Sequence, residues 1–141
     1  MKTLRSFLVA LVLLVANSGL AQKHHYFPLK DTTQTCVRLL FAGDAMQHST
    51  QYLWAWDKGT RQYNYEPNFR YLRPHLAKAD INLVNFETTL SGKPYGGYPK
   101  FRTPDAFFED MVDAGFQVFA LANNHILDGD KRGMKRTLKT V

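Results

Sequence analysis

The sequence predicts an α/β fold in which three parallel strands alternate with helices, in the order β–α–β–α–β–α. Three short apolar runs, rich in β-branched and aromatic residues, have the length of buried strands. The segments between them carry helical spacing and residues that start or stop helices. Strands joined by helical crossovers pair in parallel, with the helices covering the sheet. At 141 residues the chain holds at most one such domain.

The first residues have the pattern of a secretory signal peptide. Lys2 and Arg5 precede the apolar run Phe7–Ala16, and small residues stand at Gly19 and Ala21. The run is shorter than the roughly 20 apolar residues that a transmembrane helix needs. We therefore expect an exported protein, in the periplasm or at the cell surface, that is cleaved near Ala21. An uncleaved membrane anchor at the N-terminus is the alternative.

Composition sets further limits on the remaining chain. After the signal peptide (1–21), residues 22–36 are polar and predict a linker, and residues 37–141 predict the folded domain. Cys36 is the single cysteine, which excludes a disulfide within the chain. The formal net charge of +6 includes no dense run of Lys or Arg. Nucleic acid is therefore not expected as a partner, and the charge serves either solubility or attraction to an anionic substrate.

The first half of the domain holds two of the expected strands. They are Val37–Ala42 and Ile81–Phe86. Between them, Asn68–Lys78 has helical spacing of its apolar residues, and Pro74 kinks or restarts that helix. Three aromatic residues that precede this helix are expected in the core or in a lid: Tyr52, Trp54 and Trp56.

The second half of the domain predicts two helices around the third strand, Phe116–Leu121. The first helix is capped by Thr103, has Pro104 at its first position and ends at Gly115. Gly133–Val141 predicts the start of another helix. Four apolar residues of the first helix are expected on one face, with acidic residues opposite: Phe107, Phe108, Met111 and Val112.

Chemistry-bearing residues follow each of the three strands. Because ligands of open parallel sheets bind beyond the carboxyl ends of the strands, we expect these residues to converge. Their oxygen and nitrogen donors suit Mn²⁺, Fe or Zn²⁺ in a hydrolytic site better than a structural zinc site. Taken singly, each is equally explained as a turn or a solvated side chain. They are Asp44, His48, Glu87, Asn124 and His125.

The long segment Ser91–Arg102 follows the second strand. Its basic residues Lys93, Lys100 and Arg102 alternate with aromatic residues. They are candidates to bind an anionic polymer or a phosphoester beside the site. A packed surface loop, whose Gly and Pro serve turns, is the alternative.

Several motifs resemble the CapA family, the poly-γ-glutamate capsule biosynthesis domain that is related to calcineurin-like metallophosphoesterases. The resemblance runs from about Val37 to Val141. Its motifs are Gly43-Asp44, Ala79–Glu87 (ADINLVNFE), Phe101–Pro104 (FRTP) and Leu121–Asp128 (LANNHILD).

The resemblance implies roles for the residues after the strands. Asp44 matches the first metal-binding Asp, Glu87 stands where an Asp usually bridges two metal ions, and Asn124 matches a metal-binding Asn. His125 matches the His that contacts the scissile phosphate or protonates the leaving group. His48 stands four residues after the first Asp, where metallophosphoesterases place a metal-binding His at two.

Asp128 is expected to orient His125 rather than to bind metal, so that His125 and Asp128 form the catalytic pair. The cofactor implied is a divalent metal ion, with a pair of ions in a complete domain. The fold implied is the first half of a metallophosphoesterase-like αββα sandwich. Because no His follows His125, we expect a truncated, inactive site in this chain alone.

Three functions remain open from the sequence. The first is an exported bacterial capsule biosynthesis protein with a metal-dependent hydrolase site. The second is a non-catalytic component that exports capsule or binds its polymer, with capsule-assembly membrane proteins as candidate partners. The third is an inactive fragment.

Overall fold

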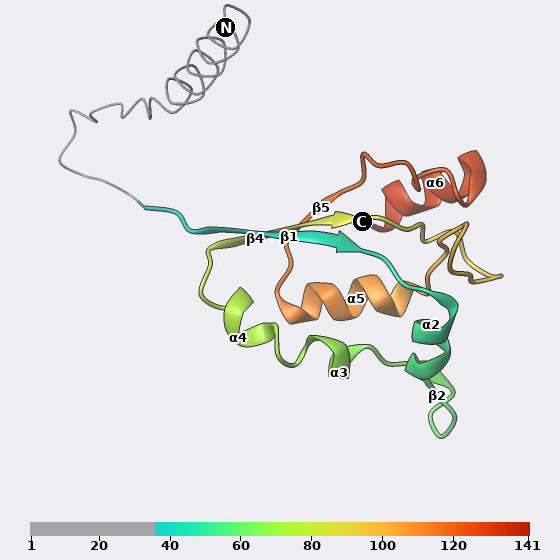
Figure 1. The fold of residues 1–141 in the computed structure, drawn as a ribbon, viewed down its shortest axis with the longest axis horizontal. Coiled ribbons are helices and arrows are strands. Elements are labelled where there is room, and N and C mark those ends of the chain that lie inside the picture. The colour runs from blue at the N-terminus through green and yellow to red at the C-terminus, as the bar shows by residue number, and fades with distance from the viewer. Residues whose placement is uncertain (1–35) are drawn as a thin grey trace, which may run out of the picture. The chain divides into compact units, whose positions relative to one another are not determined.

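A sheet of three parallel strands lies at the centre of the structure, a computed structural model that describes residues 36–141 (Figure 1). The strands are β1 (Leu39–Ala45), β4 (Ile81–Phe86) and β5 (Val118–Ala120), in the order β1-β4-β5. The predicted parallel α/β fold is confirmed. The signal peptide and almost all of the predicted linker lie outside the described residues.

The middle strand has the predicted bounds, and its neighbours differ. β1 runs to Ala45, so Asp44 lies within the strand rather than after it. Its register shifts between Phe41 and Asp44, after which Asp44 pairs with Asn85. A turn was one interpretation of Gly43-Asp44. Instead, the backbone of Asp44 pairs with β4, which extends β1 through both residues. β5 is shorter than predicted.

Helix α5 (Asp105–Ala114) covers one face of the sheet (Figure 1). Its N-cap residue is Pro104, not Thr103, whose buried hydroxyl has no hydrogen-bond partner. Gly115 ends the helix at a φ of +119°, as its position predicts. Val112 is 45% exposed, so the predicted apolar face is narrower than four residues.

The hydrophobic core lies between α5 and the sheet. Side chains alternate along β4, so that Val84 and Phe86 are buried while Ile81 is 39% exposed. Phe107 stacks near Phe86, with ring centroids 6.1 Å apart. The other buried members of this cluster are Ala55, Tyr65, Phe69, Leu76, Leu90, Met111, Ala114 and Phe116.

The connection from β1 to β4 is more broken than the sequence suggests. Two short helices, α3 (Glu66–Phe69) and α4 (Arg73–Leu76), stand where one helix with a kink or a restart was predicted, and each carries a proline in its first turn. The start of α4 at Arg73-Pro74 agrees with the predicted restart. Before them stand α2 (Ser49–Ala55) and a hairpin of β2 (Trp56–Asp57) and β3 (Gln62–Tyr63), none of which was predicted. Trp54 on α2 is 89% exposed and so lies outside the core, and its alternative place in a lid stays a prediction.

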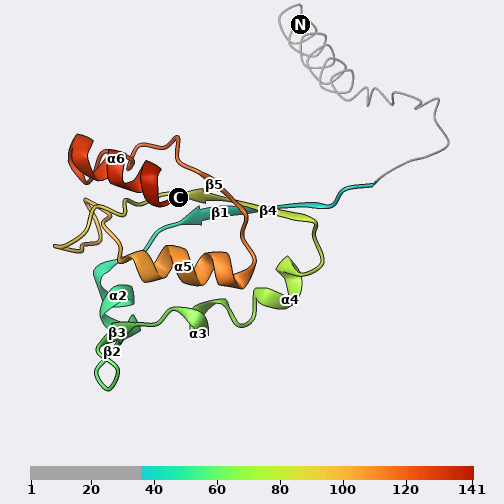
Figure 2. The same ribbon diagram turned by 180° about the vertical axis from the view of Figure 1, so that it is seen from behind.

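Helix α6 (Asp130–Thr140) begins three residues earlier than predicted and lies on the side of the sheet opposite α5 (Figures 1 and 2). Its apolar Leu138 is 57% exposed, while Gly133 and Thr137 are buried. A Cβ at Gly133 would lie 2.8 Å from the Cβ of Ser91, so a glycine allows the close approach. Within residues 36–141, no helix is long and apolar enough to cross a membrane.

Candidate functional site

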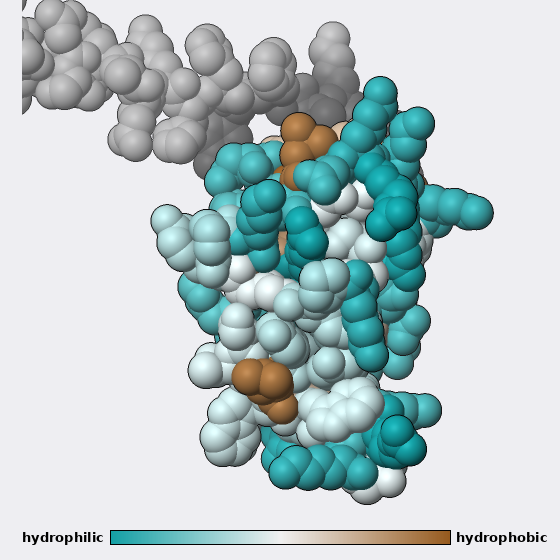
Figure 3. Space-filling model, turned by 90° about the vertical axis from the view of Figure 1, so that its right-hand side faces the viewer, coloured by the Kyte–Doolittle hydropathy of each residue, from teal (hydrophilic) through white to brown (hydrophobic). Residues whose placement is uncertain are grey.

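The carboxyl ends of the strands carry a group of polar side chains. Asp44 comes from β1, Glu87 directly follows β4, and His125 belongs to the segment after β5. Seen from the side at which the strands end, the surface is mainly hydrophilic or neutral, with small and separate hydrophobic areas (Figure 3). A parallel sheet places its carboxyl ends at one edge, which is why residues distant in sequence meet here.

The two carboxylates of this edge share one hydrogen-bond donor. Asn85 lies on β4 opposite Asp44 of β1. Its amide Nδ2 donates to Asp44 Oδ1 and to Glu87 Oε2, each over 2.8 Å. The Asp44 and Glu87 carboxylates therefore converge on a single nitrogen.

The imidazole of His125 lies between two carboxylates. Its Nδ1 is 2.7 Å from Asp128 Oδ2, and its Nε2 is 3.8 Å from Glu87 Oε1. The side chains of His125, Glu87 and Asp128 are 16%, 13% and 13% exposed. With the proton on Nδ1 donated to Asp128, Nε2 is left facing Glu87.

Asp128 is held from a second direction. Its Oδ2 also accepts the backbone N–H of Phe101 over 2.6 Å, and the ring of Phe101 packs edge-on against that of His125, with centroids 4.6 Å apart. Arg102 Nε donates to the backbone oxygen of Asp128 over 2.9 Å. The loop Ser91–Arg102 thus fixes the orientation of the imidazole.

His48 lies on the other side of the same aromatic residue. It is the N-cap residue of α2, and its ring packs edge-on against Phe101, with centroids 5.4 Å apart. Within the described chain, no hydrogen bond or ion pair joins the His48 ring to Asp44 or Glu87. Its role as a metal ligand stays a prediction.

Asn123, rather than its neighbour Asn124, contacts the carboxylate pair through Asn85. Its Nδ2 donates to Asn85 Oδ1 over 3.2 Å and to the backbone oxygen of Phe86 over 3.0 Å. Its Oδ1 accepts the backbone N–H of His125 over 3.1 Å. Asn124 is exposed, and its predicted role as a ligand stays a prediction.

Sequence reasoning missed both Asn85 and Asn123. A signal for Asn85 was present, because asparagine is depleted in strands and here interrupts an apolar run. Alternation from the buried Val84 and Phe86 also places it on the opposite face of the sheet. For Asn123 the adjacent Asn124 gave an equally good candidate, and only the backbone geometry separates the two.

The basic residues of the loop divide into two kinds. Arg102 is half-buried and braces Asp128. Lys93 and Lys100 are exposed, and neither forms an ion pair with a carboxylate among residues 36–141. The structure therefore gives Arg102 a structural contact and leaves the two lysines facing solvent.

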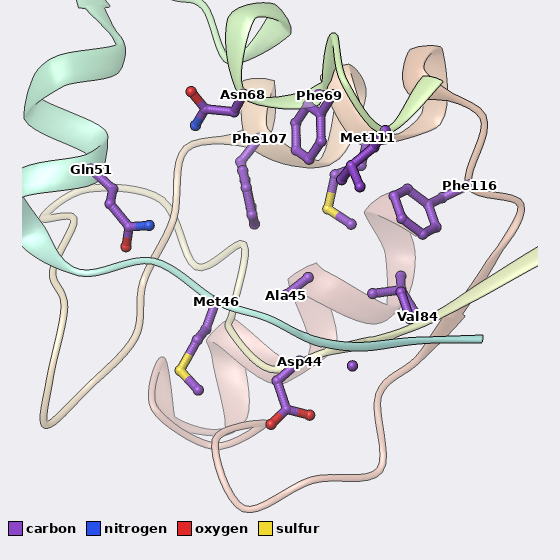
Figure 4. A pocket seen from close by; sticks show the side chains of 13 residues that line it. Asp44, Ala45, Met46, Gln51, Asn68, Phe69, Val84, Phe107, Met111 and Phe116 are labelled. Carbon is purple, nitrogen blue, oxygen red and sulfur yellow. The ribbon is translucent and has the colours of Figure 1, made fainter. Parts of the chain in front are cut away.

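A separate cavity of about 280 Å³ lies beneath β1. Its walls are mainly apolar and include Phe69, Phe107 and Met111. Figure 4 shows the Asp44 carboxylate on the other side of β1 from these side chains. Asp44 is nevertheless among the residues that line the cavity, which therefore reaches β1 at the position of this residue.

The side chains at this edge offer oxygen and nitrogen donors, but only a few of them. Residues 36–141 bring together no group of three or more His, Cys, Asp or Glu side chains that could hold a metal ion. Two carboxylates that converge on one point, with an imidazole nearby, match part of the oxygen and nitrogen set that Mn²⁺, Fe and Zn²⁺ accept. The arrangement fits such an ion in part.

Comparison with known proteins agrees with the motifs. The family model described as bacterial capsule synthesis protein PGA_cap matches residues 38–141. The capsule biosynthesis protein CapA of Bacillus anthracis is 25% identical over an alignment 136 residues long, and the match covers 91% of this chain and 31% of that protein. The chain thus spans about a third of the length of this relative. No solved structure matches. The predicted resemblance is confirmed, and the chain belongs to the family of bacterial capsule synthesis proteins that the PGA_cap model describes.

Proposed function

We propose that the protein acts in the synthesis of a poly-γ-glutamate capsule and that the site at the strand ends is part of a metal-dependent hydrolase site of the metallophosphoesterase kind. The observation that carries this proposal is the placement of His125, between Asp128 at 2.7 Å and Glu87 at 3.8 Å, beside the convergent Asp44 carboxylate. This is the spacing of an oriented general acid next to an anionic ligand set.

Each residue has a task in this proposal. The oxygens of Asp44 and Glu87 would hold the divalent ion, which would supply polarisation of a phosphoryl oxygen and activation of a water molecule. Asp128 accepts the Nδ1–H of the His125 ring. The ring acts as the acid in the form that carries a second proton on Nε2, which passes to the leaving oxygen and leaves a neutral imidazole. We assign turnover to the whole family protein, since this chain spans 31% of the length of its relative.

Titration of the metal-free chain with Mn²⁺ alone, followed by calorimetry, tests the proposal. We expect weak binding by the parent chain and at least about tenfold weaker binding by Glu87→Ala, which loses an oxygen ligand. Glu109→Ala is the matched control, because Glu109 is an exposed carboxylate on the outer side of α5. Equal affinities in all three proteins would remove Glu87 from the site.

A non-catalytic, polymer-binding role is the second candidate. It is favoured by Lys93 and Lys100, which are exposed on the loop that braces the site. In this case the chain binds poly-γ-glutamate without metal, and the affinity falls in Lys93→Ala/Lys100→Ala and with added salt. If neither the double substitution nor added salt changes the affinity for poly-γ-glutamate, this candidate is excluded.

We also propose that the protein is exported and cleaved between Ala21 and Gln22, or anchored by its uncleaved N-terminal segment. N-terminal sequencing of the protein from expressing cells decides between the two. A chain that starts at Gln22 supports cleavage, and one that starts at Met1 and sediments with membranes supports the anchor.

A further inference from the structure

We infer that Asn85 is a positioning residue, which holds Asp44, Glu87 and the segment from Asn123 to His125 in one arrangement. The inference deepens the proposed function and rests on it, in that this arrangement serves a cation site. No motif match assigns a role to Asn85.

The amide nitrogen of Asn85 joins two like charges. An asparagine Nδ2 carries two hydrogens, so it can donate to Asp44 Oδ1 and to Glu87 Oε2 at the same time. At 2.8 Å both are hydrogen bonds to charged acceptors, which are stronger than those between neutral groups. The amide thereby offsets the repulsion between carboxylates on neighbouring strands.

The amide oxygen of Asn85 extends this arrangement to the third strand. Asn85 Oδ1 accepts from Asn123 Nδ2, and Asn123 Oδ1 accepts the backbone N–H of His125. The position of the imidazole is therefore coupled to that of the carboxylates through two side-chain amides. Every polar atom of the Asn85 side chain is engaged in this chain of contacts.

The amide also selects which carboxylate oxygens remain for a ligand. It engages Oδ1 of Asp44 and Oε2 of Glu87, which leaves Oδ2 and Oε1 outside its hydrogen bonds. Oε1 is the Glu87 oxygen that lies 3.8 Å from His125 Nε2. The Glu87 oxygen that stays outside these hydrogen bonds is thus the one on the side of the imidazole.

Asn82 provides a matched control on the same strand. It lies three residues earlier on the opposite, buried face, 1% exposed, and its Nδ2 donates to the backbone oxygens of Leu76 and Gly115. No hydrogen bond joins its side chain to Asp44, Glu87 or Asn123 within the described chain. Asn82→Ser should thus lower stability without changing the carboxylate site.

The first measurement uses the metal-free chain with ¹⁵N-labelled asparagine and histidine. In Asn85→Ala we expect the side-chain amide signals of Asn123 and the imidazole signals of His125 to shift, and in Asn82→Ser both to stay. Asn85→Asp, which keeps the shape but lacks the donor, should shift the same signals as Asn85→Ala and serves if the alanine variant does not fold. Unmoved Asn123 and His125 signals in both Asn85 variants would overturn the inference.

The second measurement is Mn²⁺ affinity by calorimetry on the folded proteins. Residues that orient metal ligands change affinity by about 10–100-fold, so we expect at least a tenfold loss in Asn85→Ala and less than about twofold in Asn82→Ser. Parental affinity in Asn85→Ala would overturn the inference. If the parent chain itself binds no Mn²⁺, the proposed function fails, and the metal-free spectra alone then decide whether Asn85 positions the site.

Discussion

At the scale of single residues, Asp128 links two segments of the site through its hydrogen bonds. Asp128 receives the backbone N–H of Phe101 and the ring of His125 on one oxygen, while its own backbone oxygen receives Arg102. The carboxylate is 13% exposed, so its contacts are largely shielded from water. One side chain thus joins the segment after β5 to the loop after β4.

Replacing Asp128 by alanine should therefore destabilise the fold as well as free the imidazole. Two hydrogen bonds to a buried carboxylate are lost and the Phe101 N–H is left unpaired, which costs about 1.5–3 kcal/mol. Urea unfolding followed by circular dichroism measures this loss. Asp113→Ala is the control, since Asp113 is exposed, and an equal stability of both variants would contradict the prediction.

Tyr65 gives a prediction about pH. Its side chain is fully buried, and burial raises its pKa to about 12 from the ordinary value of 10.0. The unfolded chain ionises this phenol near its ordinary value while the folded chain keeps it neutral. Stability from Tyr65 is thus complete below pH 10 and is lost as the pH rises towards 12.

Tyr65→Phe should remove that loss and keep the apolar contact with Phe107, whose ring centroid lies 5.1 Å away. We expect the unfolding midpoint in urea to fall less steeply between about pH 10 and pH 12 in the variant than in the parent chain. Tyr63 and Tyr95 titrate in both proteins, so the difference isolates Tyr65. Parallel pH profiles of the two proteins would argue against a buried phenol.

At the scale of elements, the sequence predicted best where local signals and packing agree. β4 has its predicted bounds because INLVNF is paired on both sides. α5 ends at Gly115 because this residue adopts a left-handed backbone conformation, which glycine allows without strain. The segment from Ser49 to Leu76 was predicted poorly, because its helices are of four to seven residues and depend on tertiary contacts.

The candidate site follows the same division. The strand ends located Asp44, Glu87 and His125 at one edge, since this depends only on parallel topology. The roles of Asn85 and Asn123 depend on which amide reaches a carboxylate, and the spacing of residues does not determine that. Within an element, periodicity identifies a face, whereas a single hydrogen bond requires coordinates.

Gly115 allows a test of the end of α5. At a φ of +119° any side chain is strained, whereas the added Cβ would make only an ordinary van der Waals contact with the Cβ of Leu76 at 3.5 Å, so the cost comes from the backbone. Gly115→Ala should cost about 1–2 kcal/mol of unfolding free energy, measured by urea unfolding. Gly43→Ala is the control, because a Cβ there meets nothing within 4 Å. If Gly115→Ala has the same unfolding free energy as the parent chain, Gly115 does not end α5 in a left-handed conformation.

At the scale of the whole described region, helices cover one face of the sheet along its length, whereas on the other side α6 lies past the carboxyl ends of the strands and leaves the strands themselves uncovered (Figures 1 and 2). Helices α2 to α5 lie on one side (Figures 1 and 2). On the other side, register places Leu39 beside Ile81 and Leu83 beside Val118. Purely parallel sheets are normally covered on both faces, and a sandwich of two sheets would cover this one.

The open face predicts self-association of the chain. Phe41 is 67% exposed and pairs in register with Leu83, so it lies at the centre of this apolar surface. In sedimentation velocity, the chain lacking residues 1–21 should form concentration-dependent oligomers, and Phe41→Ser should shift it towards the monomer. The cost in stability should stay below about 1 kcal/mol, because the side chain is already exposed. Leu53→Ser, on exposed α2, is the control and should leave association unchanged. If Phe41→Ser associates as strongly as the parent chain, contacts other than the sheet face join the copies.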